Sequence, residues 1–321
     1  MNDKLRAARL SIASNTALTL SKLVVGLLMN SVSVLSEGIH SGLDLIAALI
    51  AFFSVRESSK PADECHPFGH GKFENVASIL EALLILGAAA MIIANAYPKL
   101  RGAVEINSLG LGATVMGVSA LVNYFVSREL MRVARKTESP ALAADAWHLR
   151  TDVYTSLGVL AGIIAIKLTG LTILDPIIAI GVTFLIVQAG VKLIIDSMRS
   201  ILDVQLPETE QQIIKEILSK FSSQYLEYHD LRTRRAGSQR FIVFHLVVPG
   251  GRAVSKVHDL CDQIEEEICS RFMGANVMIH TEPCYQQCNN CNQAEERIRI
   301  MNNDLTNCDY NAQAKQSPEE K

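Results

Sequence analysis

The chain has 321 residues, of which 49% are hydrophobic and 20% charged, and its formal net charge is −3 at pH 7. Because this charge is small and no run of Lys and Arg forms a phosphate-binding stripe, the composition excludes nucleic acid as a partner. The hydrophobic residues are concentrated in the first two-thirds of the chain and the mean hydropathy is positive, which is typical of a membrane protein. The last third has the composition of a soluble domain.

The first segment, MNDKLRAARLSIASN, carries charges and leads into an apolar stretch without a small-residue cleavage site. We therefore expect a retained first helix and no removed signal. Six apolar stretches have roughly the 20-residue length that crosses a bilayer. They cover residues 10–30, 32–55, 75–97, 107–128, 141–166 and 171–197. The sequence thus predicts six transmembrane helices in a domain of residues 1–203.

Basic residues gather in every second linker between these stretches. They are Lys4, Arg6, Arg9, Arg56, Lys60, Lys72, Arg128, Arg132, Arg135 and Lys136. The opposite linkers carry only Lys99, Arg101 and Lys167. Since Lys and Arg favour the cytoplasmic side, we expect both termini in the cytoplasm. We expect a multi-pass protein of a bacterial inner (plasma) membrane.

Several apolar stretches also hold polar side chains that lipid would disfavour. Lys22, Glu81 and Asn123 are the clearest, and we expect them to face the helix bundle. Glu37 lies three residues before His40, so it is a candidate outer partner of that histidine. A satisfied contact between helices is the interpretation that we favour for Glu37.

Two stretches contain a histidine followed four residues later by an aspartate. The pairs are His40 with Asp44, and His148 with Asp152. Residues at this spacing share one helix face, so two such helices offer four nitrogen and oxygen ligands to one ion. Such a set suits Zn²⁺, and ionisable groups at membrane depth indicate function. Each pair alone is equally compatible with satisfied buried side chains, but the repetition favours a metal transporter.

The loop PADECHPFGHGK contains a second group of candidate metal ligands. Asp63, His66 and His70 are spaced three and four residues apart, and Gly69 and Gly71 favour a tight turn. By spacing alone, a solvated polar loop fits these residues at least as well as a metal site.

After Leu206 the pattern predicts the element order α-β-β-α-β. Helices are expected in PETEQQIIKEILSKF and VSKVHDLCDQIEEEICSRF, and strands in DLRTRRAG, QRFIVFHLVV and ANVMIHTEP. This order predicts an α+β, ferredoxin-like domain over residues 204–285, stabilised by dimerisation. We expect residues 286–321 to be a disordered tail.

Four histidines fall in different elements of this domain. They are His229, His245, His258 and His280. Each alone is compatible with an ordinary surface histidine. Four within this short domain, with Glu282 or Asp230 nearby, favour one or two zinc sites. Since FIVFHLVV alternates, His245 is placed on the sheet face opposite the packed one.

All seven cysteines lie on the predicted cytoplasmic side, where thiols stay reduced. They are Cys65, Cys261, Cys269, Cys284, Cys288, Cys291 and Cys308. In CYQQCNNC, the spacing of Cys284, Cys288 and Cys291 is compatible with a soft-metal or zinc site or with unligated thiols. A fourth ligand is not evident there, unless His280 or another protomer supplies it.

The ordered motifs resemble the cation diffusion facilitator family of divalent metal/proton antiporters. The resemblance covers about residues 8–285 and lies in the two His-Asp pairs, PADECHPFGHGK, LRTRRAG, FIVFHLVV, VHDL and VMIHTEP. It implies a homodimer whose cytoplasmic domains respond to metal. It also implies a zinc-preferring member, because some relatives carry aspartate where His40 stands.

The resemblance implies three sets of metal ligands. His40, Asp44, His148 and Asp152 would be the transport site; Asp63, His66 and His70 a loop site; and His229, His245, His258, His280 and Glu282 the cytoplasmic sites. The cluster of Cys284, Cys288 and Cys291 receives no role from the family. We also expect Lys72 and Asp203 to form an ion pair that couples the two domains.

The expected activity is efflux of Zn²⁺ from the cytoplasm by alternating access in exchange for H⁺, because Zn²⁺ requires unprotonated ligands. Gly38, Gly42 and Gly158 are expected to permit the close helix packing that such motion uses.

Two alternatives remain. The same site could export Fe²⁺, Mn²⁺, Co²⁺, Ni²⁺ or Cd²⁺, or the protein could be a membrane-anchored zinc sensor. We do not expect an enzyme, because neither HSGLD nor HLRTD supplies the catalytic Glu of a metalloprotease.

Overall fold

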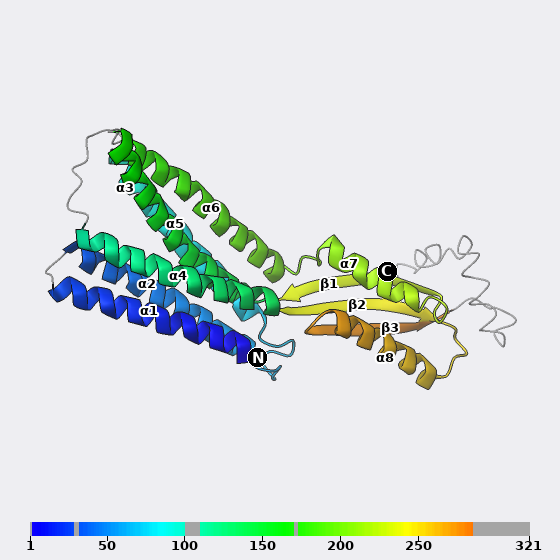
Figure 1. Ribbon diagram of the computed structural model, residues 1–321. Coiled ribbons are helices and arrows are strands. Elements are labelled where there is room, and N and C mark those ends of the chain that lie inside the picture. The colour runs from blue at the N-terminus through cyan, green and yellow to red at the C-terminus, as the bar shows by residue number, and fades with distance from the viewer. Residues whose placement is uncertain (1, 29–31, 100–109, 170–172, 285–321) are drawn as a thin grey trace, which may run out of the picture. The chain divides into compact units, whose positions relative to one another are not determined.

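The chain divides into two compact units in a computed structural model that describes residues 2–28, 32–99, 110–169 and 173–284. The first unit consists of Met1–Asp203 together with Ala236–Ser238, and the second of Val204–Arg235 together with the chain from Gln239 onward. Figure 1 shows helices alone in Met1–Asp203 and a mixture of helices and strands in the second unit.

Six long helices form the described part of the first unit. They are α1 (Asn2–Leu28), α2 (Val32–Ser58), α3 (Lys72–Lys99), α4 (Gly110–Thr137), α5 (Pro140–Thr169) and α6 (Leu174–Ile201). Each contains most of one predicted stretch and extends beyond it, because a helix continues into polar sequence where its backbone bonds remain satisfied. By length and hydropathy alone, two segments of the described residues qualify as membrane spans, Lys72–Ala94 and Pro176–Ile201.

Small side chains allow these helices to approach closely. Helix α1 packs on α2, α3 on α6 and α4 on α5, and α2 also contacts α5. Fully buried alanines occur on both α2 and α5: Ala47, Ala48, Ala51, Ala141, Ala144 and Ala146. Such residues let helix backbones come close enough for good van der Waals packing.

The glycines near the predicted transport site differ in their surroundings. A Cβ on Gly38 would lie 2.8 Å from Leu23 Cδ2, and one on Gly158 would lie 3.0 Å from Val182 Cγ2. Both glycines therefore permit close packing, as predicted. The prediction is wrong for Gly42, because a Cβ there would meet nothing within 4 Å among the described residues.

The predicted polar residues of the helices face the interior of the first unit. Lys22 is 6% exposed, Asn123 5% and Glu81 0%. The Lys22 ammonium donates a hydrogen bond to Ser41 Oγ at 2.7 Å. The side chain of Glu37 lies outside the described ones. This placement keeps the polar and charged side chains away from lipid, where exposing a charge would be costly in free energy.

The second unit has the predicted α-β-β-α-β order. It comprises α7 (Glu208–Lys220), β1 (Glu227–Ala236), β2 (Gln239–Val248), α8 (Val254–Arg271) and β3 (Ala275–Pro283). The strands lie in the order β1-β2-β3, and β3 runs parallel to β2. Gly237 and Ser238 form the turn between β1 and β2. Gly237 has φ +60°, a conformation that glycine adopts without steric cost.

A single apolar core joins both helices of the second unit to one face of the sheet. Leu218 of α7, Phe244 and Leu246 of β2, and Ile264 of α8 belong to it and are fully buried. Because side chains alternate along a strand, His245 points to the opposite face of the sheet. The domain therefore has one packed face and one face free to carry polar ligands.

The stability of the second unit is expected to fall as the pH rises from 10 towards 12. Burial raises the pKa of Tyr225 from 10.0 to about 12, and its hydroxyl donates to Leu218 O at 3.0 Å. The folded domain therefore favours the neutral phenol, and this stabilisation is complete below the unfolded pKa and lost on approaching the folded one. Alkaline unfolding of the wild type and Tyr225→Phe measures it. Parallel curves for the two proteins over this range would contradict the expectation.

Candidate metal centres

The predicted transport-site residues of α2 and α5 meet inside the first unit. Ligand atoms of Asp44, His148 and Asp152 all lie within 4.8 Å of one another. His148 Nε2 is 3.2 Å from Asp44 Oδ1. His40 lies on α2 one turn before Asp44, but its side chain is not among the described ones. One imidazole and two carboxylates therefore converge from two helices.

Burial and neighbouring groups shape this site. Asp44 is 4% exposed and His148 7%. The Asn123 amide of α4 donates a hydrogen bond to Asp152 Oδ2 at 3.2 Å. His148 Nδ1 is buried and has no hydrogen-bond partner among the described residues. An orienting bond from Asn123 fixes one carboxylate oxygen, so the other can turn toward an ion.

Asp145 is a further acidic residue that the sequence-based predictions do not include. It lies three residues before His148 on α5 and is fully buried, as is Glu81 of α3. The carboxylate oxygens of Glu81 have no hydrogen-bond partner among the described residues, and Asp145 has only the neighbouring Ser11 hydroxyl beside it in that part of the chain. Buried carboxyls without partners are costly to charge, so they favour a nearby cation or proton. An aspartate one turn from His148 in an apolar stretch is the signal that could have identified Asp145.

The loop between α2 and α3 brings Asp63, His66 and His70 together, with ligand atoms within 4.8 Å of one another. His66 Nδ1 and His70 Nε2 each lie 3.2 Å from an Asp63 oxygen, and the two imidazole centroids are 4.3 Å apart. Gly69 has φ +78°, which supports the tight turn expected there. The loop thus gathers two imidazoles around one carboxylate.

Electrostatics in this loop favour a cation. The backbone N–H of His66 donates to Asp63 Oδ1 at 2.6 Å and holds the pKa of that carboxyl below its usual value. His70 is only 5% exposed, and its Nδ1 has no hydrogen-bond partner among the described residues. An ionised carboxylate and two imidazoles fit Zn²⁺, with water completing the shell.

A third group lies on the sheet of the second unit. Ligand atoms of His229, His245 and Glu282 lie within 4.8 Å of one another. His245 Nδ1 is 2.8 Å from Glu282 Oε1, and His229 Nε2 is 3.5 Å from Glu282 Oε2. His280 Nε2 is 3.8 Å from Glu282 Oε1. The carboxylate of Glu282 is therefore the common neighbour of three imidazoles.

Strand register explains this arrangement. His245 of β2 is paired with His280 of β3, and Glu282 follows two residues later on the same side of β3. His229 comes from β1 on the other flank of β2. Asp230, with φ +51°, lies 3.8 Å from His245 Nε2, and a hydrogen bond from Arg232 lowers the pKa of Asp230. This donor set also fits Zn²⁺.

His258 does not join this group among the described residues. It lies on α8, its side chain is 73% exposed, and its Nδ1 is 3.3 Å from Asp262 Oδ1. Helix α8 packs on the sheet face that carries Phe244, whereas His245 lies on the opposite face. The sheet therefore separates His258 from the other histidines within one chain.

The structure describes only part of the predicted cysteine cluster, but both residues of the predicted Lys72–Asp203 ion pair. Cys284 is described as a free, partly buried thiol whose backbone N–H donates to Val248 O at 3.0 Å. Cys288 and Cys291, like the predicted tail, lie outside the described residues. Lys72 Nζ is 2.9 Å from Asp203 Oδ1, and both residues belong to the first unit.

Known families account for almost all of the described chain. The family model for the cation efflux transmembrane domain matches residues 8–202, and the model for the cytoplasmic domain of cation efflux proteins matches residues 206–284.

Two known transporters are similar along most of the chain, and a solved structure is similar to part of it. An uncharacterized transporter of Synechocystis is 38% identical over 276 residues, covering 86% of this chain and 89% of its own. The cation-efflux pump FieF of Salmonella paratyphi A is 32% identical over 279 residues, covering 87% and 92%. A solved structure of the putative zinc transporter CzrB in its zinc form is 40% identical over 27% of this chain and 98% of its own, with a TM-score of 0.25. Because models of both domains match and the two transporters are similar over 86% and 87% of the chain, the chain belongs to the cation diffusion facilitator family of cation efflux transporters.

Proposed function

We propose that this integral membrane cation efflux transporter moves Zn²⁺ out of the cytoplasm in exchange for protons. His40, Asp44, His148 and Asp152 are the proposed ligands of the exported ion. The observation that carries the proposal is the buried convergence of Asp44, His148 and Asp152 within 4.8 Å. Both termini are proposed to be cytoplasmic, in a bacterial inner membrane.

The donor set favours zinc over harder ions. With His40, the site would offer two imidazole nitrogens and two carboxylate oxygens, a combination suited to tetrahedral Zn²⁺. Mn²⁺ would favour more carboxylate and less imidazole, and Fe²⁺, Co²⁺, Ni²⁺ and Cd²⁺ are the other candidate ions. Salmonella FieF is called a cation-efflux pump without a stated metal, whereas CzrB is called a putative zinc transporter.

Proton exchange follows from the chemistry of the same ligands. An imidazole binds a metal only through an unprotonated nitrogen, and a carboxylate binds best when ionised. A cation that enters the site therefore displaces protons from His40 and His148, and protons that return from the other side weaken its binding. Rocking of α2 and α5 relative to the other helices would expose the site to each side in turn.

The other two ligand groups are proposed as resident zinc sites of a homodimer. Asp63, His66 and His70 would hold one ion, and His229, His245, His280 and Glu282 would hold zinc on the cytoplasmic domain. His258 has no support as a ligand from its surroundings among the described residues, and the cluster of Cys284, Cys288 and Cys291 lies mostly outside them. The pair of Lys72 and Asp203 is proposed to couple the two domains. Charge reversal of Lys72 that left dimer stability and transport unchanged would refute this coupling.

The central experiment measures Zn²⁺ uptake into proteoliposomes under an imposed pH gradient. The wild type should transport Zn²⁺ only with the gradient, and Asp152→Ala should lose transport because the site loses an anionic ligand. Asp196→Ala is the matched control, since it removes an aspartate from α6 outside the three ligand groups. Repeating the assay with Cd²⁺, Fe²⁺ and Mn²⁺ ranks the ions.

Three outcomes would change this proposal. Equal transport by Asp152→Ala and the wild type would remove the proposed site. Zn²⁺ flux that ignores the pH gradient would remove the proton exchange. Metal binding without flux of any ion would identify a membrane-anchored metal sensor instead, which is the second candidate function that the cytoplasmic ligand group favours.

A further inference from the structure

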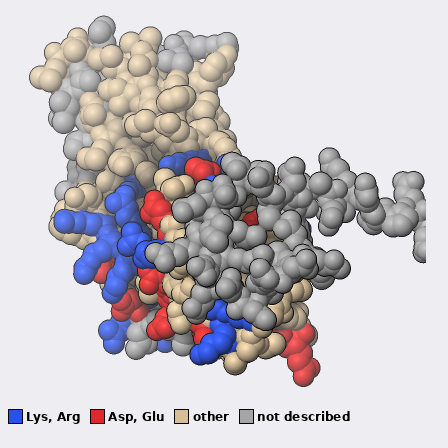
Figure 2. Space-filling view, turned by 90° about the vertical axis from the view of Figure 1, so that its right-hand side faces the viewer, with Lys and Arg blue, Asp and Glu red and all other residues tan. Residues whose placement is uncertain are grey.

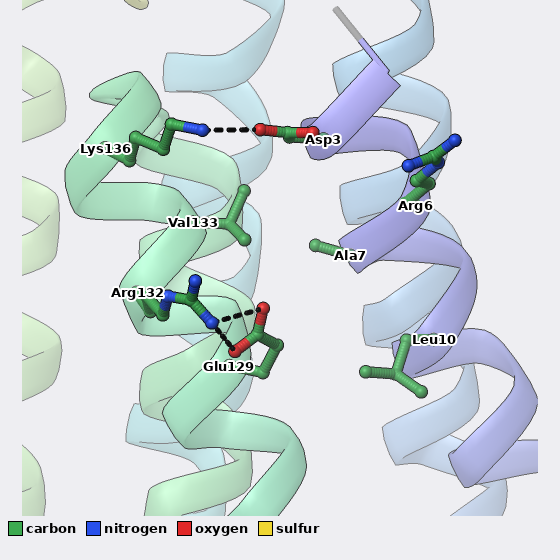
Figure 3. A pocket seen from close by; sticks show the side chains of 8 residues that line it. All are labelled: Asp3, Arg6, Ala7, Leu10, Glu129, Arg132, Val133 and Lys136. Atoms are coloured by element: carbon green, nitrogen blue, oxygen red, sulfur yellow. Dashed lines mark hydrogen bonds and ion pairs between the residues drawn. The ribbon is translucent and has the colours of Figure 1, made fainter.

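A cleft of about 290 Å³ lies between α1 and α4, away from the three ligand groups. Figure 3 shows its two walls, with Ala7 and Val133 facing each other and Leu10 further along α1. The lining residues are Asp3, Arg6, Ala7, Leu10, Glu129, Arg132, Val133 and Lys136. The cleft thus has an apolar middle, Ala7 and Val133, with the Asp3–Lys136 pair on one side of it along the helices and the Glu129–Arg132 pair on the other.

The charges of the cleft leave a positive surplus. Lys136 Nζ is 2.8 Å from Asp3 Oδ2 across the cleft, and Arg132 donates to both carboxylate oxygens of Glu129 at 3.1 and 3.4 Å. These contacts satisfy the two acids (Figure 3). Arg6, on the α1 wall, is exposed and has no ion pair within 4 Å among the described residues. Three cations against two anions favour an anionic ligand.

A series of ion pairs within the first unit relates this cleft to the cytoplasmic side. Asp203, which immediately precedes the cytoplasmic domain in the chain, pairs with Lys72 at the start of α3. Glu74, one turn further, pairs with Lys4 of α1 at 2.8 Å. Lys4 is the neighbour of Asp3 in the cleft. The cleft therefore lies at the same ends of the helices as Asp203, which is the cytoplasmic side in the orientation proposed above.

Its polarity also matches a bilayer boundary. On the face seen in Figure 2, Lys and Arg, with Asp and Glu among them, gather beside a wide surface without charged side chains. Leu10 is 42% exposed at the lower end of the cleft, whereas Ala7 and Val133 are buried. A headgroup phosphate at Arg6, Arg132 and Lys136 would leave acyl chains to follow the apolar surface beyond Leu10. A free phosphate would gain nothing from that apolar surface.

We propose that this cleft binds the headgroup of an anionic phospholipid from the cytoplasmic leaflet. The guanidinium of Arg6 would bind the phosphate directly. Arg132 and Lys136 would each keep contact with their carboxylates and donate their remaining N–H groups to the phosphate. Arg is suited to this task, because its planar guanidinium binds phosphate through two parallel hydrogen bonds.

The test counts lipids that remain on the purified full-length protein in native mass spectrometry, after addition of phosphatidylglycerol or phosphatidylcholine. The wild type should retain phosphatidylglycerol in preference to phosphatidylcholine. The double variant Arg6→Gln/Arg132→Gln should lose apparent affinity for phosphatidylglycerol on the order of tenfold or more. Arg6→Lys/Arg132→Lys should keep most of it, since the charges remain.

The matched control is Arg9→Gln/Arg135→Gln. It removes the same number of charges from the exposed ends of the same two helices, but neither residue lines the cleft. This control should bind phosphatidylglycerol like the wild type. Equal losses in the two Gln pairs would reduce the effect to general surface charge and overturn the proposal. Unchanged binding by Arg6→Gln/Arg132→Gln would also overturn it.

A second arm distinguishes a lipid from a free anion. Inorganic phosphate at the same concentration should neither bind in the cleft nor displace phosphatidylglycerol. Displacement by inorganic phosphate would identify a free-phosphate site and overturn the assignment to lipid. Unaltered thermal unfolding of all variants in detergent serves as the folding control.

Discussion

Asp44→Asn is expected to reduce Zn²⁺ flux by about a hundredfold or more at a fixed subsaturating concentration. Asp44 is 4% exposed, and its Oδ1 lies 3.2 Å from His148 Nε2. The amide of asparagine is neutral and a poor metal ligand, so the site loses one of its anionic ligands. Because the site is buried, little solvent is present to weaken the electrostatic effect of that loss. Loss of an outer partner of a metal ligand already costs 10–100-fold, and loss of the ligand itself should cost at least as much.

Flux into proteoliposomes over a range of Zn²⁺ concentrations measures this effect. Asp196→Asn on α6 is the control, because the same change there touches none of the ligand groups. Recovery of wild-type flux by Asp44→Asn at every concentration would show that Asp44 is not a ligand of the transported ion. If the flux of Asp44→Asn reached the wild-type value only at high Zn²⁺ concentration, the substitution would have lowered the affinity of the site for Zn²⁺.

Glu210→Ala is expected to destabilise the cytoplasmic domain by about 2–3 kcal/mol. Arg240 Nε of β2 lies 2.7 Å from Glu210 Oε2 of α7, and the Arg240 side chain is only 4% exposed. Removal of the carboxylate leaves a buried guanidinium without this partner, although it still lies over the Phe272 ring at 5.0 Å. Because the Glu210 side chain is still 18% exposed, the expected loss of stability is smaller than that for breaking a fully buried ion pair.

The same helix offers a matched control. Glu208 Oε1 is 3.7 Å from Lys215 Nζ, but these side chains are 75% and 41% exposed. Exposed ion pairs contribute about 0–1 kcal/mol, so Glu208→Ala should change stability little. Amide hydrogen exchange of β2 in the full-length protein measures both variants. Equal protection in Glu210→Ala and the wild type would contradict the expected cost.

Local sequence patterns predicted the elements and most of the candidate ligands that the structure brings together, because these patterns depend on spacing along one element. The four-residue spacing of His148 and Asp152 places both on one face of α5 in any helix. The alternation around His245 likewise separates it from Phe244 on β2. Both statements use only the geometry of a helix turn or a strand.

Contacts between elements were harder to predict. His258 resembled His245 as a candidate ligand, yet α8 covers the sheet face opposite to His245, and sequence spacing does not reveal which face a helix covers. Asp145 was overlooked because its significance depends on the burial of both its oxygens beside α3, and not on a repeated motif. Gly42 resembled Gly38, but within the described part of the chain only Gly38 of these two has another helix close enough to require a missing Cβ.

The buried alanines of α2 and α5 have a consequence for which mutations the protein tolerates. In the cytoplasmic domain the core consists of large side chains such as Phe244, so substitutions by smaller residues should be the damaging ones. On α2 and α5 the interior positions Ala48 and Ala144 have 0% exposure, and their side chains are already small. There, substitutions by larger residues should be damaging, since they would push α2 or α5, which carry Asp44 and His148, away from the helices packed against them. A comprehensive mutational survey under metal stress should therefore find opposite size preferences at apolar positions in the two halves of one polypeptide.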